Sequence, residues 1–166
     1  MSRVALGDTV AVGDVITSGA GARAQVTLAD ESLVLLSHDS SFRINQFSFD
    51  RPTNRRTAVV RVIKGAVRVV VFKVRSPESD LTVESDTASI VFDNLGDCVV
   101  MPGKGSTDIV ALEQAIRVKN VLSYVVGEVK MNANQRVLVS EKRAPSSPAK
   151  VLPDEKALLL RDFRSR

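Results

Sequence analysis

The chain has 166 residues, of which 44% are apolar and 25% are charged, a balance typical of one globular domain with a buried core. The net charge is +4, but the 23 basic residues are mixed with 19 acidic ones. No basic stripe with interleaved aromatic residues is present, which argues against nucleic-acid binding. Valine dominates the apolar residues, and β-branched side chains favour strands.

A single cysteine, Cys98, excludes an intrachain disulfide and a cysteine-rich metal cluster. It lies in the apolar run Cys98–Met101, so we expect a small buried residue there and not a nucleophile. Residues 1–30 are interrupted by Gly and Asp and do not resemble a secretory signal. No apolar run reaches the roughly 20 residues that a helix needs to cross a bilayer. We expect a soluble chain that needs no metal or cofactor, and if the protein is exported its signal has been removed.

Turn residues recur through the first half of the chain. Glycine and aspartate pairs at residues 7–8 and 13–14 bracket the short segment Thr9–Val12, and Asp30–Ser32 predicts a hairpin turn into residues 33–36. The expected inward-facing side chains of this region are Ala24, Val26, Leu28, Phe42, Ile44, Phe47 and Phe49. The regular spacing of short strands favours a twisted β-solenoid or a β-sandwich over alternating strands and helices.

A polar segment at residues 50–57 predicts an exposed loop. After it, residues 58–63 and 66–74 are valine-rich on both faces, which is typical of strands in the centre of a sheet. Arg68 interrupts the second of these strands, and it must pair with a carboxylate or reach water because an unpaired buried charge is unfavourable. Eight further short strands are predicted: residues 81–83, 89–92, 98–101, 108–112, 116–118, 121–126, 129–131 and 137–139.

Helical features occur only at the C-terminal end. We divide the chain into an all-β domain at residues 1–142, a Pro/Ser linker at 143–152 and a helix at 153–166. Proline at the start, acidic residues next and basic residues last suit the helix dipole, and Leu159 and Phe163 lie on one face. This helix either covers an open end of the domain or docks on a partner.

The order of features over residues 7–75 resembles the FecR domain, the extracytoplasmic domain of bacterial iron-dicitrate-type signal-transduction regulators. The segments that carry the resemblance are Gly13–Gly19, Ala22–Asp30, Ser32–Leu35, Ser40–Ile44, Phe47–Asp50 and Ile63–Arg68. Beyond residue 80 the pattern is weaker. Ala88 and Ile90 match, but the proline and the Arg-Gly-Thr turn that the family usually has there are missing.

The resemblance implies an all-β fold, a periplasmic or secreted location and a role in relaying a signal by contact with an envelope protein. Six residues of the pattern suit structural roles. Gly13, Gly19 and Gly65 lie where tight turns favour positive φ, Asp14 and Asp30 can accept local backbone N–H groups, and Arg68 can form a bidentate pair with an acidic turn residue.

Two enzymatic alternatives are weak. His38 lies beside Asp39 and Ser40, but adjacent turn residues rarely hold the geometry of a catalytic triad. Asp86 with Thr87 and Ala88 could resemble the site of a dimeric aspartic protease, in which two carboxylates share a proton. Glu84 would crowd such a pair of carboxylates, so an acidic turn is the better interpretation.

A binding role therefore remains. We expect a non-catalytic protein-interaction module whose contact is either an exposed basic loop or the C-terminal helix. The candidate residues are Arg51, Arg55 and Arg56 in the loop and Leu159 and Phe163 on the helix. The alternative is a structural subunit of an envelope-spanning assembly, which would form a fixed oligomer where a relay domain would bind transiently.

Overall fold

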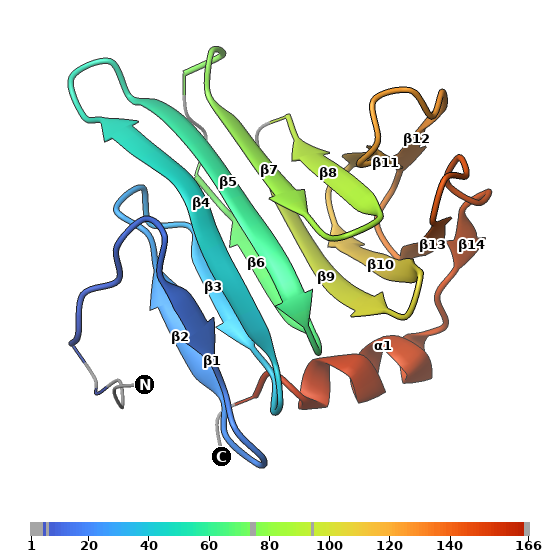
Figure 1. Ribbon diagram of the computed structural model, residues 1–166, viewed down its shortest axis with the longest axis horizontal. Helices are drawn as coiled ribbons and strands as arrows, with labels where there is room; N and C mark the ends of the chain where they lie inside the picture. The colour runs from blue at the N-terminus through green and yellow to red at the C-terminus, as the bar shows by residue number, and fades with distance from the viewer. Residues whose placement is uncertain (1–4, 6, 74–75, 94, 165–166) are drawn as a thin grey trace.

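The short apolar alternations form two sheets in the computed structural model, which describes residues 5, 7–73, 76–93 and 95–164 (Figure 1). Sheet A contains, in spatial order, β1 (Val15–Thr17), β4 (Ser41–Asp50), β5 (Arg55–Lys64), β7 (Asp80–Glu84), β8 (Ala88–Phe92), β11 (Ile116–Asn120) and β12 (Glu128–Met131). Sheet B contains β2 (Ala24–Thr27), β3 (Leu33–Leu36), β6 (Val67–Val71), β9 (Gly96–Gly103), β10 (Ser106–Glu113), β13 (Gln135–Ser140) and β14 (Ala149–Lys150).

In both sheets the spatial order of the strands follows their order in the chain. The chain crosses repeatedly between the two sheets of the sandwich. Each crossing adds a strand next to the previous one in its sheet, as successive turns do in a solenoid. Early strands lie at one end of the molecule and late strands at the other (Figure 1). The all-β fold expected from the sequence is confirmed, and the two expected forms are combined in one structure.

The inner faces of the two sheets meet in one core of β-branched and aliphatic side chains. Burial alternates along the strands, as in β6, where Val67, Val69 and Val71 are buried. In β4 the alternation changes phase because the register with β5 shifts between Ile44 and Gln46. This irregularity lets Phe42 and Ile44, and then Phe47, all face the core.

Three local expectations differ from the structure. The loop predicted at residues 50–57 is shorter, because β5 already begins at Arg55 and pairs with Asp50. The strand predicted at 121–126 is a loop between β11 and β12. The strand predicted at 66–74 is described as β6 only to Val71, and residues 74–75 lie outside the described residues.

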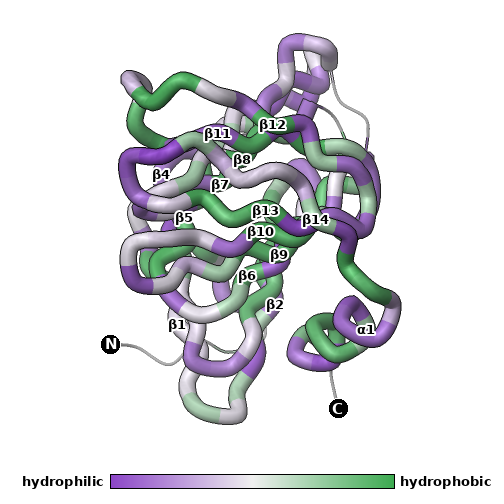
Figure 2. Tube along the Cα trace, turned by 90° about the vertical axis from the view of Figure 1, so that its right-hand side faces the viewer, coloured by the Kyte–Doolittle hydropathy of each residue, from purple (hydrophilic) through white to green (hydrophobic). Residues whose placement is uncertain are grey.

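The helix α1 (Pro153–Arg161) lies outside the sandwich, beside sheet B (Figure 2). A second apolar cluster joins α1 and the residues around it to the outer face of sheet B. Its buried members are Val99, Val110, Leu112, Val151 and Phe163. The helix thus covers a sheet face and not an end of the domain. The division into an all-β domain at 1–142, a linker at 143–152 and a helix at 153–166 stays a prediction.

Candidate interaction surfaces

The turn residues of the FecR pattern are held by local bonds. Gly13 has a φ of 95°, its N–H donates to the Ile44 carbonyl at 2.8 Å, and Asp14 Oδ2 accepts the Ala11 N–H at 2.9 Å. Gly19 was expected to need positive φ, but Gly21, with a φ of 68°, takes that conformation in the same turn. Sequence alone could not choose between two glycines that share one turn.

Asp30 and Arg56 form a buried ion pair. Arg56 Nη1 donates to Asp30 Oδ2 at 2.8 Å, and the Arg56 side chain is 1% exposed. Asp30 also accepts the N–H of Ser32 at 3.1 Å, which is the local bond expected of it. The expectation that Arg56 belongs to an exposed basic loop is wrong, because β5 begins one residue earlier and turns this side chain toward the core.

Arg68 and Asp97 form a bidentate pair across sheet B. Arg68 donates from Nε to Oδ1 at 2.9 Å and from Nη2 to Oδ2 at 2.6 Å, and this hydrogen bonding raises the pKa of the Arg68 guanidinium. The carboxylate comes from strand β9, whereas the sequence suggested a turn residue. Burial raises the pKa of the neighbouring Cys98 thiol, and the charge of Asp97 adds to this effect.

At the tip of the β4–β5 hairpin, Arg51 and Arg55 are exposed. Arg55 Nη1 lies 3.4 Å from Glu78 Oε2 in an ion pair that is open to solvent. Both arginines are exposed, unlike Arg56, and their role as partner contacts stays a prediction.

On α1 and just beyond it, Leu159 is half-buried and Phe163 is buried against sheet B. Two polar contacts add to this packing. Arg23 Nε donates to the Asp162 carbonyl at 2.6 Å, and Lys156 Nζ donates to the Leu112 carbonyl at 3.0 Å. The face that the sequence offered to a partner is therefore used inside the molecule.

The residues considered for catalysis do not form an active-site geometry. His38 and Asp39 form an exposed pair, while the hydroxyl of Ser40 donates to the His38 main-chain carbonyl at 3.0 Å. The Asp86 side chain is 82% exposed and pairs with Arg61 at 2.6 Å. Among the described residues, no three His, Cys, Asp or Glu side chains are grouped as metal ligands would be.

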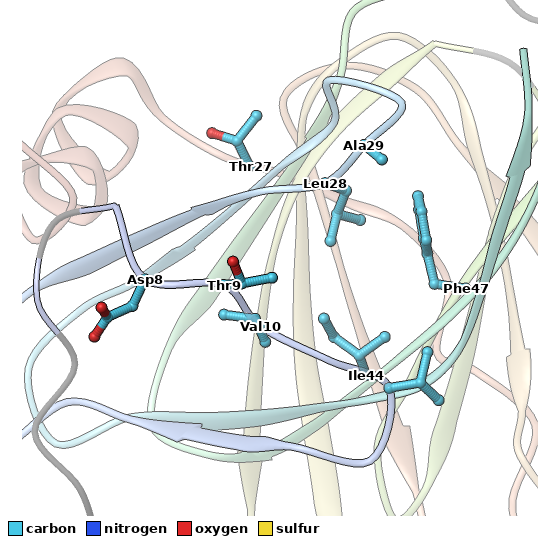
Figure 3. A pocket seen from close by; sticks show the side chains of 9 residues that line it. Asp8, Thr9, Val10, Thr27, Leu28, Ala29, Ile44 and Phe47 are labelled. Carbon is cyan, nitrogen blue, oxygen red and sulfur yellow. The ribbon is translucent and has the colours of Figure 1, made fainter.

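A cavity of about 360 Å³ lies at the end of the sandwich where the early strands gather. Val10, Leu28, Ile44 and Phe47 project into it from three separate segments (Figure 3). Asp8, Thr9 and Thr27 also border it, but the Asp8 and Thr27 side chains point away from the apolar group (Figure 3). The alternation of apolar residues predicts that those of β2 and β4 face inward, but no sequence pattern indicates that they leave a space between them.

The edge of sheet A beside this cavity is only partly covered. Strand β1 pairs with Ser41–Arg43, whereas β4 continues to Asp50. Along Gln46–Ser48, β4 has β5 on one side and, in the part of the chain that the structure describes, no strand on the other. An open strand edge and an apolar cavity thus lie next to each other.

The sequence model of the family described as FecR protein matches residues 14–117. The chain belongs to the FecR family. The match extends from the turn before β1 to β11, so it includes the second half of the domain, where the sequence pattern was weak. Comparison with curated proteins gave no match for this FecR domain.

Two crystal structures of a candidate anti-sigma factor from Parabacteroides distasonis have the same fold. Both give a TM-score of 0.67, at 17% and 16% sequence identity. The aligned region covers 89% of the FecR chain and 64% of each crystal structure, so the FecR chain spans less than two thirds of their length. No helix among the described residues is both long and apolar enough to cross a membrane.

Proposed function

We propose that this FecR domain is a non-catalytic extracytoplasmic module that relays a signal by binding an extended segment of an envelope protein. The proposal is supported by membership of a family of signal-transduction regulators and by the fold that the domain shares with a candidate anti-sigma factor. The observation that carries it is the cavity beside the open part of β4.

Phe47 faces the core from β4 but is only half-buried, and Val10 is half-buried on the opposite side of the cavity. Side chains with this orientation are normally covered from all sides in a sandwich. A segment that lies along Gln46–Ser48 would extend sheet A by one strand. Main-chain hydrogen bonds then supply affinity, and alternate side chains that enter a pocket supply selectivity.

The expected ligand is therefore an extended peptide with a large apolar side chain at one inward position. Thr9, which also lines the cavity, would offer a polar group to the peptide backbone or to a flanking polar residue. The β4–β5 hairpin with Arg51 and Arg55 continues from the same strand, so the two arginines would contact the end of a longer partner segment.

The test uses the full chain and a displayed library of random twelve-residue peptides. Enriched peptides are measured against the wild-type domain, Ala29→Trp and Ala22→Trp. Ala29 lines the cavity, and a tryptophan there would fill it, whereas Ala22 is an exposed control near the other end of β2. We expect peptides with alternate apolar residues that lose affinity by about tenfold or more with Ala29→Trp only, since filling the pocket removes a buried side chain worth about 1.5–3 kcal/mol.

A library without enrichment would contradict the proposal. Peptides that bind equally well to all three proteins but are lost with Arg51→Glu and Arg55→Glu would place the contact on the hairpin. If the protein instead copurifies from envelope extracts only as a fixed-ratio oligomer, a structural subunit is the better description.

A further inference from the structure

The end of the molecule opposite the cavity carries a second open edge, formed by β12. In sheet A, β12 pairs with β11 on one side, and within the described residues no strand lies on its other side. We propose that β12 pairs antiparallel with β12 of a second copy of this chain, so that two domains form a dimer around a two-fold axis.

The register of β12 fixes which side chains lie on each face. Glu128 pairs with Lys119 and Lys130 with Arg117, so both β12 charges are on the outer face of sheet A. Val129 is half-buried and Met131 is fully buried on the core face. Exposed charges on an edge strand discourage pairing with arbitrary strands, but they favour a strand with the complementary order of charges.

The charge order of β12 is complementary to itself. If two copies pair antiparallel with Val129 opposite its counterpart, each Glu128 lies opposite Lys130 of the other copy. The isologous contact therefore contains two cross-strand ion pairs. Opposite residues of neighbouring strands point to the same face, which excludes pairing Val129 with Glu128 or Lys130 of the other copy. The registers centred on Glu128 or on Lys130 keep the faces, but they place two like charges opposite each other, so charge favours the register centred on Val129.

Within one copy, Glu128 has a partner of opposite charge, whereas none is seen for Lys130 among the described side chains. Glu128 lies 3.5 Å from Arg117, which also contacts Asp93 at 2.5 Å. Lys130 is next to Arg117 in the register, and among the described side chains no carboxylate forms an ion pair with it. Glu128 of a second copy would supply the missing negative charge.

The loop that leads into β12 is apolar and exposed. Tyr124 is 67% and Val126 is 89% exposed, although both belong to a run that the sequence suggested as a strand. Three hydrogen bonds hold the start of this loop, two donated by Asn120 Nδ2 to the Ser140 and Arg143 carbonyls and one accepted by Asn120 Oδ1 from Leu122. In the proposed dimer, Val126 would approach Asn132 of the second copy and lose part of its exposed apolar surface.

The dimer would form one sheet from sheet A of both copies and leave the two cavities at its far ends, because β1 and β12 lie at opposite ends of the molecule (Figure 1). This inference is independent of the peptide-binding proposal, since it uses neither the cavity nor β4.

The test measures self-association of the full chain by sedimentation over a wide range of concentrations. Glu128→Lys places two lysines opposite each other, and Lys130→Glu places two glutamates opposite each other. We expect each single variant to weaken the dimer by about tenfold or more, because two attractive pairs become repulsive. Mixing the two variants restores both pairs and should restore a dimer that contains one copy of each.

The matched control is the exposed pair Glu141 and Lys142, whose charges can be exchanged away from β12 without an expected effect. The double variant Glu128→Lys with Lys130→Glu should dimerise as the wild type does. Restoration in the mixture requires both variants to be folded, so it separates charge repulsion from misfolding. A wild-type protein that stays monomeric, a dimer insensitive to both single changes, or a mixture that stays monomeric would overturn the proposal.

Discussion

Arg56 of β5 and Asp30 of the β2–β3 turn meet inside the protein, with Nη1 and Oδ2 2.8 Å apart. β5 belongs to sheet A and the β2–β3 turn to sheet B, so this ion pair joins the two layers. Arg56 Nε also donates to the Asp80 main-chain carbonyl at 3.2 Å. The main-chain N–H of Arg56 donates to Ser79 Oγ at 2.9 Å. The family pattern around Asp30 therefore maintains a contact between sheets as well as a turn.

Replacing Arg56 by leucine should lower the free energy of unfolding by about 3–5 kcal/mol, because it removes a buried guanidinium that pairs with the Asp30 carboxylate. Urea unfolding measures the change. Arg55→Leu is the matched control and should change the free energy by less than about 0.5 kcal/mol, since its ion pair with Glu78 is exposed. Asp30→Leu together with Arg56→Leu should cost less than the sum of the single changes. An Arg56→Leu variant as stable as Arg55→Leu would show that the buried ion pair does not contribute to the free energy of unfolding.

Cys98 should make stability depend on alkaline pH. Burial raises the pKa of the folded thiol above its usual value near 8.5, so the folded state keeps its proton while the unfolded state loses it. The unfolded state then binds fewer protons, and stability should fall by about 1.4 kcal/mol for each pH unit above about 8.5 until the folded pKa is reached. Cys98→Ala should remove this part of the slope. Parallel stability curves for the two proteins between pH 8 and 10 would contradict the prediction.

Gly65 should resist substitution for a steric reason. Its φ is 75°, and a Cβ atom would lie 2.7 Å from Ser40 Cα and 2.8 Å from the Asp39 carbonyl oxygen. We expect Gly65→Ala to destabilise the protein by more than about 2 kcal/mol, as measured by denaturant unfolding. Gly105→Ala is the control, because Gly105 has a φ of 71° with no atom within 4 Å of the new Cβ, and it should cost about 1 kcal/mol. If the two variants lose the same stability, the effect at Gly65 comes from its positive φ alone, and the steric explanation is wrong.

Phe163 should anchor the segment after α1 to sheet B. Phe163→Ala removes a buried ring from the cluster with Val110 and Leu112, and we expect a loss of about 3 kcal/mol in thermal or urea unfolding. The same variant should bind more of a dye that reports exposed apolar surface. Leu158→Ala serves for comparison, because Leu158 is exposed, and its effect should stay within about 0.5 kcal/mol. If the two variants behave alike, the helix is only loosely attached.

Much of the fold follows from local features of the sequence. Alternation of valines over Val67–Val71, and turn residues between short apolar runs, predict strands because a strand presents alternate side chains to opposite faces. The helix at Pro153–Arg161 is predicted for a similar local reason, since proline and acidic residues begin it and a basic residue ends it. The run from Val121 to Val126 was predicted wrongly, because its apolar character comes from an exposed loop that local propensity cannot distinguish from a strand.

Periodicity and turn chemistry within a few residues are enough to predict the class of fold, the family and the positions of most strands. The three-dimensional fold sets where β5 begins relative to Asp50, and for that reason Arg56 is buried while Arg55 stays exposed. It also decided that Phe163 packs on the protein's own sheet, that a cavity remains between Val10 and Phe47, and that β12 is an open edge. Each of these features joins segments far apart in the chain, and contacts of that kind leave no pattern in a single sequence.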